Sequence, residues 1–247
     1  MAADAGYHAD KFDRGYTHLI NIWGADHHSY VSRLKAAVSA LGYPVENLDI
    51  ILTQMVALLR NGEAIIGGKR SGAVIELKEE LVDEIGKDAA RFYFLLNSYE
   101  TPATVDVELA RKQSNDNPVY YVQYAHARLC NIRAKAIEAG IELVEAEQAN
   151  RALLTNPAEI EVLRKLTEYP AEVAYAAKEY SPHRLTRVAM DLAGLLNVFY
   201  ENCRVLSGGD EVVEIEVTHA RLALANSAKI VLRNLLTLLG ISAPEKM

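Results

Sequence analysis

The stretch NPVYYVQYAHARL, residues 117–129, decides the fold class of this chain. Pro118 suits the first turn of a helix, where its missing N–H costs no hydrogen bond. The apolar residues that follow recur at helical spacing, beginning with Val119, Val122, Ala125, Ala127 and Leu129. The pattern continues almost to the C-terminus, and we expect further helices over residues 157–169, 172–180, 182–200 and 216–239. The chain is therefore predicted to be mainly α, ending in an all-α helical bundle.

The residues before this bundle follow a different pattern. HLINIWGADHH, residues 18–28, predicts a short apolar strand that runs into a loop at Gly24. A helical pattern follows from Tyr30 and stops at Gly42, and a β-rich run comes next. Strand, helix and strand in this order are typical of an open α/β unit. We therefore expect three parts, namely a partial Rossmann-like α/β segment, a helical connecting segment and the helical bundle, over residues 1–77, 78–114 and 115–247.

Composition and charge limit the classes of protein that fit. Half of the 247 residues are apolar, and no apolar run approaches the ~20 residues that cross a bilayer. The N-terminus lacks the basic and apolar segments of a secretion signal, and two cysteines provide neither a disulfide framework nor a four-cysteine zinc site. We expect a cytoplasmic protein with no membrane or DNA partner. The formal net charge of −7 argues against nonspecific nucleic-acid binding but leaves room for a selective RNA site.

Two glycine-containing loops are candidate nucleotide contacts. In WGADHH, residues 23–28, Gly24 permits close approach and Asp26 could accept hydrogen bonds from a ribose, although Asp26 could equally cap a helix. The adjacent histidines diverge on a helix, so no metal site is expected. GGKRSG, residues 67–72, could hold an anion through Lys69 and Arg70, or it could be a solvated turn.

The bundle carries candidate RNA contacts. Tyr120 and Tyr124 share a helix face at i, i+4, with Gln123, His126 and Arg128 nearby, and this set would suit unstacked RNA bases. The alternative is that the tyrosines are core residues. The same two interpretations apply further along, where Phe199, Tyr200 and Arg204 could form a base pocket or finish a helix. No nucleophile elbow or catalytic triad emerges from the motifs.

Taken together, the segments resemble the second half of class I arginyl-tRNA synthetases, in the family's order and over almost the whole chain. The matching stretches are GYHADKF (6–12), WGADHHSYV (23–31), QMVALLRNGE (54–63), KRSG (69–72), DAARFYFLLNS (88–98), NPVYYVQYAHAR (117–128), SPHRLTRVAMDLAGLLNVFYENCRVL (181–206) and ANSAKIVLRNLLTLLGISAPEKM (225–247).

The resemblance implies roles for the two loops. Gly24, Asp26 and His27 occupy the adenosine-binding loop of the family, which uses ATP with Mg²⁺. Lys69 and Arg70 lie where the family carries its Lys-Met-Ser-Lys type loop, which stabilises the triphosphate. Ile66, Gly67 and Gly68 replace the expected Lys, Met and Ser, so one phosphate-binding cation is lost and transition-state stabilisation should suffer.

For the remaining residues, the resemblance implies contacts with arginine and with its tRNA. Asp4 and Tyr7 correspond to the wall of the amino-acid pocket. The surface that reads the anticodon loop of arginine tRNA would lie on or near Tyr120, Gln123, Tyr124, Arg128, His183, Arg184, Phe199, Tyr200, Arg204 and Met247.

The first half of such an enzyme, with its His-Ile-Gly-His type motif, has no counterpart in these residues. Our leading hypothesis is therefore the C-terminal portion of an arginine–tRNA ligase that binds tRNA but forms no adenylate by itself, so that no cofactor is assigned to the chain alone. Two alternatives are a noncatalytic tRNA-binding or regulatory protein and a subunit that completes a separate N-terminal half. An exposed sheet edge is expected to pair with that half or with a second copy.

Overall fold

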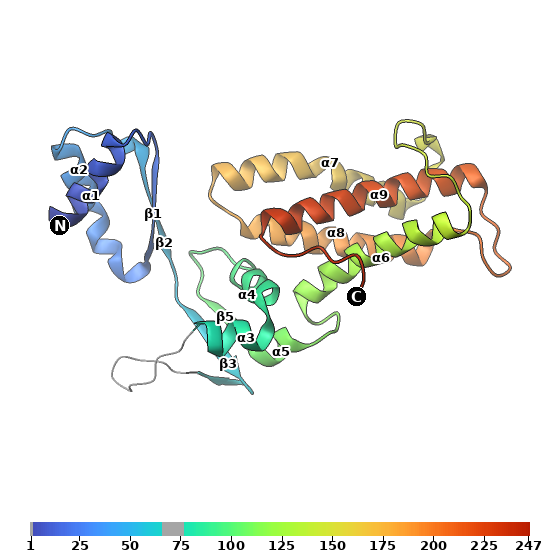
Figure 1. Ribbon diagram of the computed structural model, residues 1–247, viewed down its shortest axis with the longest axis horizontal. Helices are drawn as coiled ribbons and strands as arrows, with labels where there is room; N and C mark the ends of the chain where they lie inside the picture. The colour runs from blue at the N-terminus through green and yellow to red at the C-terminus, as the bar shows by residue number, and fades with distance from the viewer. Residues whose placement is uncertain (1, 66–76) are drawn as a thin grey trace. The chain divides into compact units, whose positions relative to one another are not determined.

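The computed structural model describes residues 2–65 and 77–247 (Figure 1). The chain forms two compact units. Unit 1 comprises the described residues up to Ala57 together with Tyr99–Thr104, and unit 2 comprises the described residues of Leu58–Ser98 together with Val105–Met247. The predicted fold class, a partial α/β segment followed by a helical bundle, is confirmed.

Unit 1 contains the predicted strand, helix and strand. β1 (Leu19–Gly24) and β2 (Leu48–Thr53) are parallel neighbours, and α2 (Val31–Ala40) lies between them in sequence after a 3-10 turn at Ala25–Tyr30. Their shared core contains Leu19, Leu34, Val38 and Leu48, which are all buried. An additional helix, α1 (Ala2–Asp13), was not expected. Only His8 of α1 is buried, so the helix shows little of the apolar period that identifies helices from sequence.

The other face of this sheet carries exposed apolar side chains from β1 beside Asp49 of β2. Side chains alternate between the faces of a strand, so Leu19 and Asn21 point into the core while Ile20 and Ile22 point away. Ile20 is 46% exposed and Ile22 is 68% exposed. Parallel sheets are normally covered on both faces. Among the described residues, nothing encloses Ile20 and Ile22 in the way that the faces of such a sheet are usually enclosed.

A short hairpin begins the second sheet. β3 (Val56–Arg60) pairs antiparallel with β4 (Glu63–Ala64), and β5 (Ala103–Asp106) is the other neighbour of β3. The turn residues Asn61 and Gly62 both have positive φ, at 53° and 80°. Two such residues match the twist of a tight two-residue hairpin, which is the structural basis of the predicted turn at RNGE.

Helices dominate unit 2. A π-helical turn at Lys78–Val82 leads into the shorter helices α3 (Asp83–Ile85), α4 (Lys87–Phe94) and α5 (Val107–Arg111). The bundle itself consists of α6 (Pro118–Glu138), α7 (Pro157–Lys178), α8 (His183–Asn202) and α9 (Ile215–Leu238), with a 3-10 turn at Arg151–Leu153 (Figure 1). Its core includes the fully buried side chains of Leu192, Leu196, Phe199, Leu232, Leu235 and Leu236.

The sequence prediction of two separate helices over 157–169 and 172–180 is wrong. The structure has one helix, α7, which continues through Pro170. Proline removes one helical hydrogen bond and crowds the preceding turn. The apolar face that α7 packs against α8 and α9 continues on both sides of Pro170, and burial of that face outweighs the local cost.

A buried ion pair anchors the start of α7. Asn156 and Glu159 form a capping box, in which the Asn156 N–H donates to Glu159 Oε2 at 2.8 Å. The Glu159 side chain is fully buried, and its Oε1 accepts a hydrogen bond from Arg221 Nε at 2.6 Å. Arg221 also donates to the Arg204 carbonyl at 2.6 Å. Glu159 therefore joins the N-terminus of α7 to α9.

Within the described ranges, no helix combines the length and the apolar character that a membrane span requires.

Candidate functional site

The first candidate site is the loop at the carboxyl end of β1. A Cβ on Gly24 would lie 2.6 Å from Oδ1 of Asp26, so glycine leaves room for that carboxylate to fold back over the backbone. The Asp26 side chain is 81% exposed, and His27 Nε2 lies 3.8 Å from its Oδ2. An exposed carboxylate beside an open backbone at this edge of a parallel sheet can accept hydrogen bonds from ribose hydroxyls. Gly24 and Asp26 therefore fit the ribose contact that the sequence predicts.

Asp4 and Tyr7 lie on α1 in the same unit. The Tyr30 hydroxyl donates to Asp4 Oδ2 at 2.9 Å, and this hydrogen bond is the main reason that the pKa of the Asp4 carboxyl is lowered. The Asn21 amide donates to His8 Nε2 at 2.7 Å, so the proton of that ring lies on Nδ1, which donates to the Asp4 carbonyl at 2.7 Å. Asp4 is thus held in place, whereas the Tyr7 ring is exposed.

Lys69 and Arg70 lie outside the described residues, as do Ile66, Gly67 and Gly68. Their expected role at a triphosphate stays a prediction, and so do the expected roles of Gly24, Asp26 and His27.

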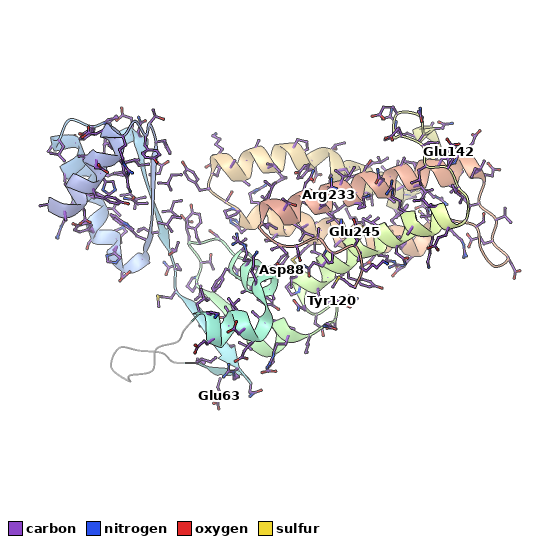
Figure 2. All side chains as sticks on the ribbon, in the orientation of Figure 1. Glu63, Asp88, Tyr120, Glu142, Arg233 and Glu245 are labelled. Atoms are coloured by element: carbon purple, nitrogen blue, oxygen red, sulfur yellow. The ribbon has the colours of Figure 1, made fainter. Side chains whose placement is uncertain are left out.

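The second candidate site is a cavity of about 630 Å³ in unit 2. Three residues that the sequence placed near RNA, Tyr120, Gln123 and Met247, line it together although 124 positions separate Gln123 from Met247. The rest of the lining comes from α3, α4, α5, the segment that joins α5 to α6, and the start of α6. It includes the cations Lys87, Arg111 and Lys112 and the acids Glu84 and Asp88. Figure 2 labels Asp88 on α4 and Tyr120 at the start of α6. The cavity thus combines an aromatic ring, amide and carboxylate groups, and positive charge.

An aromatic surface continues along α6. The rings of Tyr120 and Tyr124 are stacked, with centroids 6.0 Å apart and planes 8° apart, and Tyr124 is 41% exposed. Further along the helix, the Arg128 guanidinium lies 3.9 Å above the Tyr200 ring. Of the two interpretations of the α6 tyrosines, an accessible stacking surface fits Tyr124, because that ring is not part of the core.

Two other predicted contacts, Arg184 and Arg204, form ion pairs within the protein. Arg184 makes a bidentate pair with Glu172, with Nε and Nη2 at 2.9 Å from its two carboxylate oxygens, and lies 4.5 Å above the Tyr175 ring. Arg204 Nη1 lies 3.3 Å from Glu211 Oε2. His183 is the first residue of α8. None of these three residues lines the cavity in unit 2, and their expected roles at RNA stay predictions.

Phe199 and Tyr200 are core residues at the end of α8. Phe199 is fully buried, so its ring could reach a base only if the bundle opened. Tyr200 is largely buried as well, and burial raises the pKa of its phenol. Its hydroxyl oxygen has no hydrogen-bond partner among the described residues. Packing at the helix end, which was the second interpretation of this stretch, fits Phe199.

Sequence reasoning missed Asp88. It lies in DAARFYFLLNS, where the helical spacing identifies only the apolar residues. A single acidic residue near a helix N-terminus is common and does not by itself indicate a functional role. In the structure its Oδ2 accepts a hydrogen bond from Gln123 Nε2 at 3.0 Å. No local signal could have found this contact, because 35 positions separate the two residues.

Comparison with known proteins agrees with this architecture. Arginine–tRNA ligases of Moorella thermoacetica and of Desulfitobacterium hafniense strain DCB-2 are 49% and 50% identical to this chain, over 247 and 248 residues. Each match covers the whole of this chain but only 43% of the relative. The chain thus spans less than half the length of the curated relatives that it matches.

Solved structures and a family model extend the comparison. A Campylobacter jejuni crystal structure assigned as an arginyl-tRNA synthetase superposes with a TM-score of 0.86 at 34% identity and covers all of this chain and 51% of that one. Thermus thermophilus arginyl-tRNA synthetase shares the fold, with a TM-score of 0.69 at 24% identity over 94% of this chain and 41% of that one. Residues 122–247 match the DALR anticodon binding domain. The chain therefore belongs to the DALR anticodon-binding family and corresponds to the C-terminal part of arginyl-tRNA synthetases.

Proposed function

We propose that this chain supplies the tRNA-binding part of an arginine–tRNA ligase and that unit 2 binds the anticodon loop of arginine tRNA. The observation that supports this most directly is the cavity in unit 2, where Tyr120, Gln123 and Met247 meet beside Lys87 and Lys112.

The groups around this cavity suit a splayed nucleotide. The Tyr120 and Tyr124 rings offer faces on which bases can stack, while the side-chain carbonyl of Gln123 can accept a hydrogen bond from a base edge. The lysine side chains can neutralise phosphates on either side. This arrangement also explains how a chain with a net charge of −7 would bind RNA, because a few placed cations and stacked rings replace a general positive surface.

Removal of one stacking ring should weaken this binding. We expect Tyr124→Ala to lower the affinity for arginine tRNA about tenfold, since a base–aromatic stack contributes about 1–3 kcal/mol. Filter binding at fixed salt measures the effect. Tyr16→Ala is the matched control, because Tyr16 is an exposed tyrosine of unit 1, and it should leave the affinity unchanged.

The same assay with an anticodon-substituted tRNA tests the anticodon itself. Selective binding of arginine tRNA by the wild-type chain supports the proposal. Equal affinity for both tRNAs would contradict anticodon recognition, and would also count against a regulatory protein that uses this surface.

Unit 1 would supply part of an ATP site. Gly24, Asp26 and His27 would hold the adenosine, with Lys69 and Arg70 at the phosphates and Asp4 and Tyr7 near the arginine. ATP with Mg²⁺ provides the leaving group when arginine is activated as an adenylate, and these residues would bind and orient it.

The open face of the unit 1 sheet supports a second proposal, a surface for the rest of a catalytic α/β domain. Ile20 and Ile22 on β1 present an apolar strip where a parallel sheet is normally covered. The relatives that this chain matches are more than twice as long, so they contain the kind of segment that could pack there. A second copy of the chain is the competing occupant.

We expect no arginine-dependent ATP–pyrophosphate exchange from this chain alone and measurable exchange when the N-terminal segment of the Moorella thermoacetica ligase is added. Ile22→Asp should abolish the gain, because a charge in an apolar interface is costly to bury. Val212→Asp is the control, since Val212 is an exposed apolar residue of unit 2. ATP–pyrophosphate exchange by the chain alone would refute the proposed surface, and so would an equal gain of exchange activity with Ile22→Asp. If the wild-type chain dimerises and Ile22→Asp does not, the occupant of the surface is a second copy of the chain.

A further inference from the structure

We propose that Asp88 is a positioning residue that holds the C-terminal tail, residues 240–247, as a wall of the unit 2 cavity and thereby sets the affinity for RNA. The inference rests on the proposed anticodon-binding function and adds a residue that does not itself need to touch the RNA. Its basis is a polar clasp formed by Asp88 and Arg91 of α4 and by Gln123 and His126 of α6.

The α4 half of the clasp holds the tail where it leaves α9. Asp88 and Arg91 are three residues apart and therefore share one helix face. Arg91 Nε donates to the carbonyl of Leu239 at 3.1 Å, and its guanidinium lies 2.6 Å from where a Cβ on Gly240 would be. Gly240 has a φ of 69°, which suits glycine. Asp88 Oδ2 then accepts the backbone N–H of Ser242 at 3.2 Å and also its hydroxyl.

The α6 half repeats this spacing. Gln123 and His126 are again three residues apart, and they hold the next part of the tail. Gln123 Nε2 donates to the Ser242 carbonyl at 2.9 Å, and His126 Nδ1 donates to the Pro244 carbonyl at 2.9 Å. Burial lowers the pKa of His126, which favours the neutral ring that serves here as a single donor. The tail ends beside α6 (Figure 1).

Asp88 links the two halves. Its Oδ2 accepts hydrogen bonds from both Ser242 and Gln123, so one carboxylate oxygen connects α4, α6 and the tail. Asp88, Gln123 and Met247 all line the cavity, which places the clasp in its wall. Four residues lie between the held Ser242 and Met247. Without the clasp, the ordering of this segment would have to be supplied by RNA binding.

The test combines hydrogen exchange with RNA binding in the full chain. We expect Asp88→Ala to speed exchange of the Ser242 amide about tenfold while the amides of α9 stay protected, because the carboxylate is the acceptor of that N–H. We expect the same variant to lower the affinity for arginine tRNA about tenfold. Asp210→Ala, which removes an exposed acid outside the clasp, should change neither quantity.

A double-mutant cycle shows whether Asp88 acts through the tail. If it does, Asp88→Ala and Met247→Ala together should weaken binding by much less than the product of their separate effects. A purely structural role would leave the two effects multiplicative and would expose the α9 amides, and either result would overturn the proposal. Unchanged exchange at Ser242, or faster exchange with unchanged affinity, would overturn it as well.

The two assays also separate this inference from the proposed function. If the wild-type chain binds no tRNA, the proposed function is wrong and no effect of Asp88→Ala on affinity can be measured. The exchange experiment would still decide whether Asp88 holds the tail, because that measurement needs no RNA.

Discussion

Arg221→Met is expected to lower the free energy of unfolding by about 3 kcal/mol or more. Glu159 is fully buried, and Arg221 is its cationic partner at 2.6 Å. Removal of one member leaves an uncompensated charge in the interior, which typically costs about 3–5 kcal/mol. The same substitution leaves the Arg204 carbonyl without the hydrogen bond that Arg221 donates. Urea denaturation followed by circular dichroism gives the change directly.

Two further variants separate charge burial from the loss of a side chain. Arg164→Met removes an exposed i, i+3 pair with Glu161 on the same helix as Glu159, and such pairs contribute less than about 1 kcal/mol. Glu159→Gln combined with Arg221→Met should be more stable than Arg221→Met alone, because the neutral amide can still complete the capping box. A loss below about 1 kcal/mol for Arg221→Met would mean that the buried pair does not stabilise the fold.

Phe199→Ala should destabilise the chain by about 3–5 kcal/mol, the usual result of deleting a buried aromatic ring. Phe199 is fully enclosed in the bundle core and its ring centroid lies 5.7 Å from that of Tyr200. The truncation would leave a cavity that the packed helices cannot fill completely. Thermal and urea unfolding both report the loss, and Val198→Ala, at a neighbouring residue that is 46% exposed, should change stability little.

This prediction also decides between the two interpretations of Phe199. If the ring is only a core residue, then RNA affinity measured where the variant is still folded should match that of the wild-type chain. If folded Phe199→Ala loses much of its affinity for RNA but little stability, then Phe199 contacts RNA.

The fold was predictable where one element carries its own signal. Leu19–Gly24 and Val31–Ala40 have uninterrupted strand and helix patterns, and the structure forms both. The break expected near Pro170 did not occur, because proline's local effect was outweighed by packing of α7 against distant helices. Helix α1 was missed for the converse reason, since it buries little and so has a weak apolar period.

The cavity in unit 2 was predictable only in part. Tyr120 and Gln123 stand out on one helix, and the resemblance added Met247, but their meeting depends on a tail that returns to α6. Arg204 was also proposed from its residue type, and Arg184 from the family resemblance. Their pairing with Glu172 and Glu211 could not be read from spacing alone, because side-chain partners depend on how the helices and the loop after α8 are placed.

By itself, the sequence determined the order of elements, the change from α/β to helical character and the family resemblance, because periodicity, glycine and proline act over a few residues. Only the tertiary structure decided that Phe199 is enclosed, that Glu159 meets Arg221, and that Asp88 joins the tail to α6. Those outcomes depend on contacts across 62 positions for Glu159 and Arg221 and 154 for Asp88 and Ser242. Burial and hydrogen bonding at such separations are properties of the packed chain, and no local pattern encodes them.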